Sequence, residues 1–257
     1  MTLPALLFLP FFYRLTGEFT LNERARKAAL VAYAFGSPAF VYSLLLMGHQ
    51  LAGICLALAF FLLIRVTKHE TKHPHRALIG AGFLAGLAPL MDYQATLVVP
   101  ALGIYLLARS QHRVRDAAVF ALSVLPGPLV LGFYHLKCFG SPFRISYGYG
   151  LDTAPKEGVL GFIGPNLASL HNILTTPSNG LFTMSPWLIV AALGAFLLLR
   201  HKQSSGARRE AWLCLAVILI YTLFVGSMLP YMARGGWSAG ARQLVATLPF
   251  YGALAAK

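Results

Sequence analysis

The chain has 257 residues, of which 57% are hydrophobic and only 11% are charged, and its mean hydropathy is +0.66. A soluble domain carries about 25% charged residues because its surface faces water, so this composition excludes an ordinary soluble domain and indicates a protein surrounded largely by lipid. The formal net charge is +13, but the basic residues stand in short clusters between apolar runs and form no basic face with interleaved aromatics, which excludes a nucleic-acid partner.

The apolar segments predict an all-α, polytopic membrane bundle. About nine such segments follow one another, approximately over residues 2–13, 28–45, 47–64, 77–91, 95–108, 116–136, 181–199, 211–229 and 243–256. Several are shorter than the roughly 20 residues that a helix needs to cross the hydrocarbon. We expect residues 1–257 to form a single transmembrane domain.

Helix breakers and small residues mark points within these segments. Gly36-Ser37-Pro38 and Pro126-Gly127-Pro128 are expected to interrupt the second and sixth segments, which membranes tolerate where neighbours satisfy the freed backbone groups. Gly82 and Gly86 lie four residues apart in the fourth segment and predict a helix-packing face.

The loops alternate between rich and poor in positive charge, which predicts the topology. One set carries 16 basic residues: Arg14, Arg24, Arg26, Lys27, Arg65, Lys68, Lys72, Arg76, Arg109, Arg113, Arg115, Arg200, Lys202, Arg208, Arg209 and Lys257. The other carries five: Lys137, Arg144, Lys156, Arg234 and Arg242. The first set is therefore expected to be cytoplasmic, with the N-terminus outside and the C-terminus inside a bacterial inner membrane.

Two segments carry further expectations. Met1 to Tyr13 resembles the second half of a span whose beginning is absent, with a short first helix as the alternative. Residues 137–180 form an extracytoplasmic loop rich in Gly, Pro and aromatics, within which residues 162–174 are expected to make a short amphipathic helix at the interface.

Asp92 and His49 are the first candidate site residues. Asp92 is the one acidic residue at the outer end of the helical hairpin 77–108, and an ionisable group at that depth is by default a functional candidate. Its alternative role is a solvated turn residue or helix cap. His49, with Tyr42 seven residues before it, is expected to contribute to a substrate site that opens outside. The alternative for His49 is a buried histidine bonded to a neighbouring helix.

Arg234 and Arg242 bracket a glycine-rich junction, GGWSAG, that contains Trp237. Arginine makes bidentate contacts with phosphate oxygens, and glycine lets backbone N–H groups approach an anion, so these residues are candidates for binding a lipid phosphate. The alternative is that the arginine side chains merely snorkel to the interface.

No cofactor or metal site is predicted. His69, His73 and His75 lie in a basic loop where Pro74 keeps them from sharing one helical face, so a solvated loop is the better interpretation. The nucleotide-binding, hydrolase and metalloprotease motifs of soluble enzymes do not occur in the sequence.

Five stretches in order resemble the bacterial polytopic glycosyltransferases of the GT-C superfamily, relatives of the protein O-mannosyltransferases and of the lipid A aminoarabinose transferase. They are residues 35–53 (FGSPAFVYSLLLMGHQLAG), 80–102 (GAGFLAGLAPLMDYQATLVVPAL), 139–150 (FGSPFRISYGYG), 178–194 (SNGLFTMSPWLIVAALG) and 235–250 (GGWSAGARQLVATLPF). The last is similar to a GGWSFGPRxLxxxLPF pattern, in which Arg242 matches the motif arginine and Ala241 replaces the usual proline.

The resemblance implies a GT-C-like core and hexosyl transfer from a polyprenyl-phosphate sugar donor to an acceptor at the outer face. In that family the catalytic acid lies in the first outside loop, to which no segment here corresponds, so the resemblance assigns no catalytic residue. We therefore expect a truncated or inactive form, which would be an enzyme if an N-terminal portion were restored. The alternatives are a transporter or flippase for a lipid-linked sugar and a non-catalytic membrane subunit. Donor sugar and acceptor stay open, and membrane lipids are the other expected partners.

Overall fold

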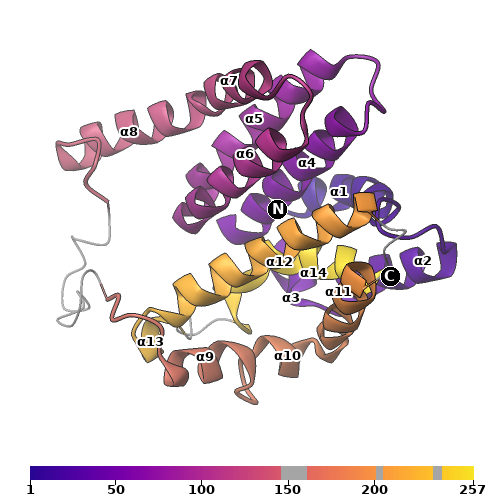
Figure 1. The fold of residues 1–257 in the computed structure, drawn as a ribbon. Helices are drawn as coiled ribbons and strands as arrows, with labels where there is room; N and C mark the ends of the chain where they lie inside the picture. The colour runs from indigo at the N-terminus through magenta and orange to yellow at the C-terminus, as the bar shows by residue number, and fades with distance from the viewer. Residues whose placement is uncertain (146–160, 201–204, 234–238) are drawn as a thin grey trace.

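A computed structural model describes residues 1–145, 161–200, 205–233 and 239–257 of the chain. Within those ranges every regular element is helical, and the sole β-type pairing is an isolated bridge between Phe162 and Met228. The prediction of an all-α fold is thereby confirmed (Figure 1).

The helices follow the apolar segments of the sequence. The first half of the chain forms α1 (Thr2–Thr16), α2 (Glu23–Phe35), α3 (Pro38–Leu44), α4 (Gly48–Thr67), α5 (Pro74–Met91), the 3-10 helix η1 (Tyr93–Leu97), α6 (Val98–Arg109), α7 (Arg113–Val124) and α8 (Pro126–Phe139). The second half forms α9 (Leu167–Leu174), α10 (Leu181–Met184), η3 (Pro186–Ile189), α11 (Val190–Arg200), α12 (Ser205–Gly226), α13 (Pro230–Ala233), η4 (Arg242–Thr247) and α14 (Leu248–Ala255).

The apolar segments expected from the sequence are helical, but few of the helices are long enough to cross a membrane. In the described ranges three helices are long and apolar enough to cross a membrane: Gly48–Thr67, Arg113–Phe139 and Ala207–Gly226. Two shorter apolar helices cover Thr2–Thr16 and Pro186–Arg200. Of the other apolar segments, 77–91 lies within the single 18-residue helix α5, whereas 28–45, 95–108 and 243–256 are each divided into two shorter helices. The chain is a multi-pass membrane protein.

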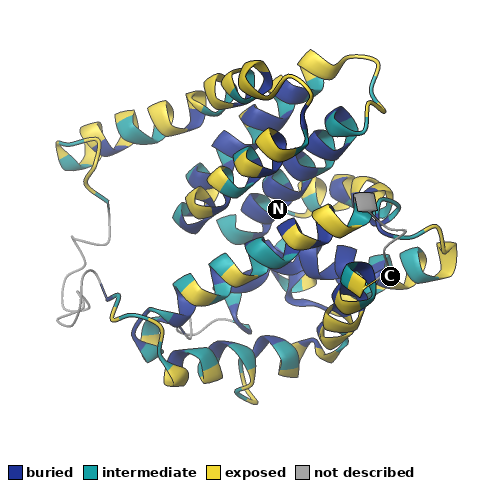
Figure 2. Cartoon of the chain, viewed as in Figure 1, coloured by how far each residue is buried: buried dark blue, intermediate teal, exposed yellow. Residues whose placement is uncertain are grey.

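Helix α4 forms the centre of the bundle, with α1, α5, α6 and η4 packed around it. Leu56, Phe60 and Leu63 on α4 are completely buried. Figure 2 shows the contrast between this inner helix pair, α4 and α5, and the largely exposed α8. Leu129 and Phe133 on α8 expose 67% and 61% of their surface, and an apolar face of that kind fits contact with lipid.

The two predicted interruptions behave differently. At the first, α2 ends at Phe35 and the Ser37 hydroxyl caps α3 by accepting a hydrogen bond from the backbone N–H of Ala39 at 3.2 Å. At the second, α7 ends at Val124 and α8 begins at Pro126, so the predicted interruption is present. It is slight, because Leu125 between them keeps right-handed helical dihedrals and the apolar helical stretch continues from Arg113 to Phe139. Pro126 takes the first position of α8, where its missing N–H costs little.

Gly82 and Gly86 confirm the predicted packing face. A Cβ on Gly86 would overlap the carbonyl oxygen of Val124, and one on Gly127 would overlap the carbonyl oxygen of Gly86. The backbones of α5 and the α7–α8 helix therefore touch without side chains between them, as in small-residue packing in membranes. The short helix expected within residues 162–174 is also present, as α9.

Candidate functional site

Asp92 lies where α5 ends and η1 begins, and both of its carboxylate oxygens are engaged. One oxygen accepts a hydrogen bond from the backbone N–H of Gln94 at 3.2 Å, which caps η1. The other lies 3.1 Å from Nδ1 of His49. The side chain of Asp92 is 5% exposed, against 20% for His49, so the imidazole is the more accessible partner. Asp92 is therefore a cap of η1, as its alternative interpretation expected, and it is at the same time the partner of His49.

Gly48 explains how two residues from different helices come together. It is the first residue of α4, and a Cβ there would overlap the backbone carbonyl of Met91, the last residue of α5. The start of α4 thus packs directly on the end of α5, and the residues that follow each, His49 and Asp92, meet. His49 is bonded to a neighbouring helix end, as its alternative interpretation expected.

Two glutamines, which the sequence analysis did not single out, extend the polar cluster. Gln94 Nε2 donates to Oε1 of Gln243 at 3.3 Å, and Gln243 Nε2 donates to the Met232 carbonyl at 3.1 Å. This chain of amides links η1 to η4 and α13. The signal in the sequence was position alone, since each glutamine lies within two residues of a candidate charge, Asp92 or Arg242.

Arg242 begins η4, directly before Gln243, and is half-buried. Its Nε is buried and has no hydrogen-bond partner in the described part of the chain. Gly53 lets η4 approach α4, because a Cβ there would come within 2.8 Å of the Cα of Ala246. The helix η4, which begins at Arg242, is thus held against α4, and Arg242 directly precedes Gln243 of the polar cluster. Arg234 and Trp237 lie outside the described residues.

Tyr42 has a different environment from the one expected. Its side chain is completely buried in α3, and its hydroxyl donates to the carbonyl oxygen of Ala239 at 3.0 Å. The tyrosine therefore holds the segment that leads into Arg242.

An apolar cavity of about 730 Å³ adjoins the polar cluster. Its walls come from η1, α8, α12 and α13, with Leu129, Phe133, Phe224, Met228 and Met232 among the lining residues. Gln94 and Tyr93, the residues just after Asp92, also line it. The cavity is therefore largely apolar and has polar lining at Tyr93 and Gln94, the two residues that follow Asp92.

One histidine on the cavity wall contacts Tyr93, the residue that follows Asp92. His135 of α8 is 3% exposed; its Nε2 lies 2.9 Å from the Tyr93 hydroxyl and its Nδ1 lies 3.3 Å from the Pro142 carbonyl. With Nδ1–H donating to that carbonyl, Nε2 accepts from the tyrosine. A hydrogen bond between two residues that line the cavity thereby connects helix α8 to η1.

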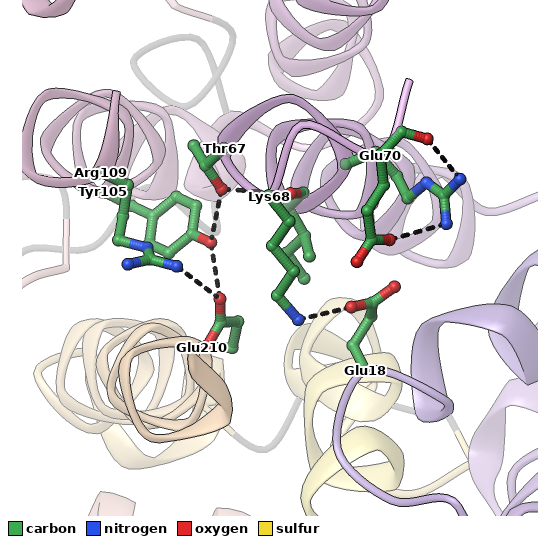
Figure 3. A network of polar contacts seen from close by, with 9 residues as sticks. Glu18, Thr67, Lys68, Glu70, Tyr105, Arg109 and Glu210 are labelled. Atoms are coloured by element: carbon green, nitrogen blue, oxygen red, sulfur yellow. Dashed lines mark hydrogen bonds and ion pairs between the residues drawn. The ribbon is translucent and has the colours of Figure 1, made fainter. Parts of the chain in front are cut away.

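A second polar network, shown in Figure 3, lies near the last residues of α4 and α6 and the start of α12. These are the ends of α4 and α6 away from His49 and Asp92. The completely buried Glu210 of α12 accepts a hydrogen bond from Tyr105 at 3.0 Å and lies 3.9 Å from Arg109. Lys68 donates to Glu18 at 2.6 Å. Lys68 and Arg109 were expected in loops rich in positive charge, and their contacts could not be foreseen from the sequence. Among the described residues no group of three metal-ligating side chains gathers at either end.

Comparison with known proteins gives one match. The family model for dolichyl-phosphate-mannose-protein mannosyltransferase matches residues 2–131, about half of the chain, which include His49 and Asp92 but not Arg242. Neither a curated protein nor a solved structure matches the chain. The chain therefore belongs to the dolichyl-phosphate-mannose-protein mannosyltransferase family, membrane glycosyltransferases that use a lipid-linked sugar donor.

Proposed function

We propose that this chain binds a polyprenyl-phosphate-linked sugar, with the prenyl chain in the apolar cavity and the sugar phosphate at the polar cluster, and transfers the sugar to an acceptor at the outer face. The observation that carries the proposal is the junction of the two environments at Tyr93 and Gln94, which line the cavity and directly follow Asp92. A ligand with a polar head and a long apolar tail fits such a site.

The phosphate is assigned to Arg242. Its buried Nε lacks a partner among the described residues, and a buried guanidinium donor without one is costly. A phosphate oxygen supplies a charge-assisted acceptor, and the planar guanidinium can bind two such oxygens. Gln243 directly follows Arg242 in the chain, and its amide and that of Gln94, 3.3 Å apart, supply donors and acceptors for sugar hydroxyls.

His49 is the residue best arranged to accept a proton from the acceptor hydroxyl. Asp92 accepts a hydrogen bond from Nδ1–H, which leaves Nε2 as the basic nitrogen and stabilises the imidazolium that forms when it takes a proton. The bond from the anomeric carbon to the phosphate oxygen breaks as the bond to the acceptor oxygen forms. The polyprenyl phosphate leaves with the electron pair, and the guanidinium of Arg242 stabilises its negative charge.

The test is binding and turnover by the purified chain in detergent. Polyprenyl-phosphate mannose and polyprenyl phosphate should both bind, whereas the uncharged polyprenol, which keeps the tail and lacks the phosphate, should bind at least about tenfold more weakly. Equal affinity for all three would exclude the phosphate site. Binding together with movement of the donor across a vesicle membrane, without sugar transfer, would favour the transporter or flippase.

A further inference from the structure

A second cavity, of about 440 Å³, lies at the end of the bundle opposite to Asp92. Arginine dominates its lining, which consists of Arg14, Gly17, Glu18, Arg26, Phe61 and Arg65. The three guanidinium groups come from three different helices, α1, α2 and α4. Their meeting is therefore a product of the tertiary fold, and one loop rich in basic residues does not account for it.

The carboxylates near this cavity do not balance its positive charge. Glu18, the acidic residue in the lining, already accepts a hydrogen bond from Lys68 at 2.6 Å, and both side chains are largely buried. Arg65 pairs with Glu70 at 2.9 Å. Arg14 and Arg26 form no ion pair with a carboxylate in the part of the chain that the structure describes.

Arg26 is fixed in place and keeps an unused donor. One of its terminal nitrogens donates to the Tyr13 carbonyl at 2.9 Å, and its guanidinium carbon lies 4.0 Å from the centre of the Tyr13 ring. Its Nε is buried and has no hydrogen-bond partner among the described residues. Gly17 leaves room for the group, because a Cβ there would lie 3.1 Å from a terminal nitrogen of Arg26.

We propose that this cavity binds a phosphate group through Arg14 and Arg26. A pre-oriented guanidinium with an unused N–H donor suits phosphate oxygens better than an ammonium group would. The cavity lies at helix ends, between the last turn of α1 and the first turn of α2. Basic pockets between membrane helices bind anionic phospholipid headgroups, and a soluble phosphate ester offers the same chemistry. The site is separate from the one assigned to the sugar donor.

The test compares three single substitutions in the full chain. Arg14→Gln and Arg26→Gln each remove one charge from the cavity. Arg24→Gln removes the same charge from an exposed position in the first turn of α2, outside the lining. A thermal melt confirms folding, and if Arg26→Gln fails because it loses its bond to Tyr13, Arg14→Gln decides the outcome.

The probes are phosphatidylglycerol and phosphatidylcholine in mixed micelles, and glycerol 3-phosphate in solution, with bound lipid counted by native mass spectrometry. Wild type should prefer phosphatidylglycerol to phosphatidylcholine. Arg14→Gln and Arg26→Gln should each weaken its binding about tenfold or more, and Arg24→Gln should leave it unchanged. Saturable binding of glycerol 3-phosphate with the same dependence on Arg14 would support the phosphate site and identify a soluble ligand. Equal losses in all three variants, or no loss in Arg14→Gln, would show that the arginines only contribute general surface charge and would overturn the proposal.

Discussion

The imidazole of His49 lies 3.1 Å from the carboxylate of Asp92, although the two residues are 43 positions apart in the chain. The contact depends on Gly48, whose missing side chain lets the start of α4 touch the end of α5. A carboxylate that is 5% exposed needs such a partner, because an unpaired buried charge is costly. The pair lies beside the residues that line the apolar cavity, and the first prediction follows from it.

His49→Gln should reduce sugar transfer while donor binding changes little. Glutamine keeps a hydrogen-bonding group next to Asp92 but cannot take up a proton, and general-base assistance contributes about 10²–10⁴-fold to a rate. Transfer of mannose from polyprenyl-phosphate mannose and the donor Kd should be measured on the same preparation. His112→Gln, an exposed histidine before α7, is the control. Full activity of folded His49→Gln would show that His49 has a structural role alone.

Arg242→Ala should weaken polyprenyl-phosphate binding by roughly 10–150-fold, since a hydrogen bond to a charged group is worth about 1.5–3 kcal/mol. Arg242→Lys should recover only part of that loss, because an ammonium group cannot bind two oxygens in the same geometry. Arg208→Ala removes an equal charge from an exposed position on α12 and should have no effect. Equal dissociation constants for wild type, Arg242→Ala and Arg242→Lys would mean that the arginine only snorkels to the interface.

The helices and the individual candidates could be predicted from the sequence, because apolar runs, breakers and isolated charges are local signals. Ser37, Asp92 and His49 were identified in this way, and the structure explains each by a hydrogen bond. The pairing of His49 with Asp92 could not be predicted. It depends on how closely α4 and α5 approach, and one sequence does not give the register between two helices.

Other contacts could not be predicted because the residues that make them have no distinctive signal in the sequence. Gln243 is uncharged and stands at the start of an apolar run, so apart from its position next to Arg242 nothing in the sequence indicated its contact with Gln94, 149 positions away. Glu210 follows two arginines and resembles a solvated loop residue, yet it is completely buried. The break at Pro126 was predicted from the sequence, but its slightness was not, because a proline at the first position of a helix does not require the preceding Leu125 to leave the helical conformation.

Gly132→Leu should reduce the affinity for donors with long prenyl chains. Gly132 lines the apolar cavity on α8, and a Cβ there would meet only the Pro142 side chain, at 3.5 Å. The protein can therefore accommodate a leucine at this position, and its side chain would occupy the space assigned to the prenyl tail. Affinity for a donor with one or two isoprene units should change less than that for a long-chain donor. Gly103→Leu adds the same side chain to α6 outside this cavity, and an equal effect there would exclude the cavity as the tail site.

Gly127→Ala should destabilise the bundle because its Cβ would overlap the Gly86 carbonyl. Overpacking of this kind costs about 1–3 kcal/mol, which a lower melting temperature in detergent would report. Gly80→Ala, on the facing helix α5, is the control: its Cβ would meet only the flexible end of Leu62, at 3.4 Å. An unchanged melting temperature for Gly127→Ala would show that α5 and α8 are farther apart than the structure has them.

The last prediction concerns orientation, and it rests on the 16 basic residues of one set of loops against the five of the other. Lys72 is exposed between α4 and α5, in a loop predicted to be cytoplasmic. Cys138 is an exposed thiol at the end of α8, on the side predicted to be outside. In intact cells an impermeant thiol reagent should therefore label the native Cys138. It should label Lys72→Cys, made in a Cys138→Ser background, only after the membrane is permeabilised. The remaining cysteines are a suitable background, since Cys214 is buried and Cys55 is only partly exposed within α4. Labelling of Lys72→Cys in intact cells, with Cys138 protected, would reverse the orientation. It would move the Asp92–His49 site to the cytoplasmic face and the arginine-lined cavity to the outer leaflet.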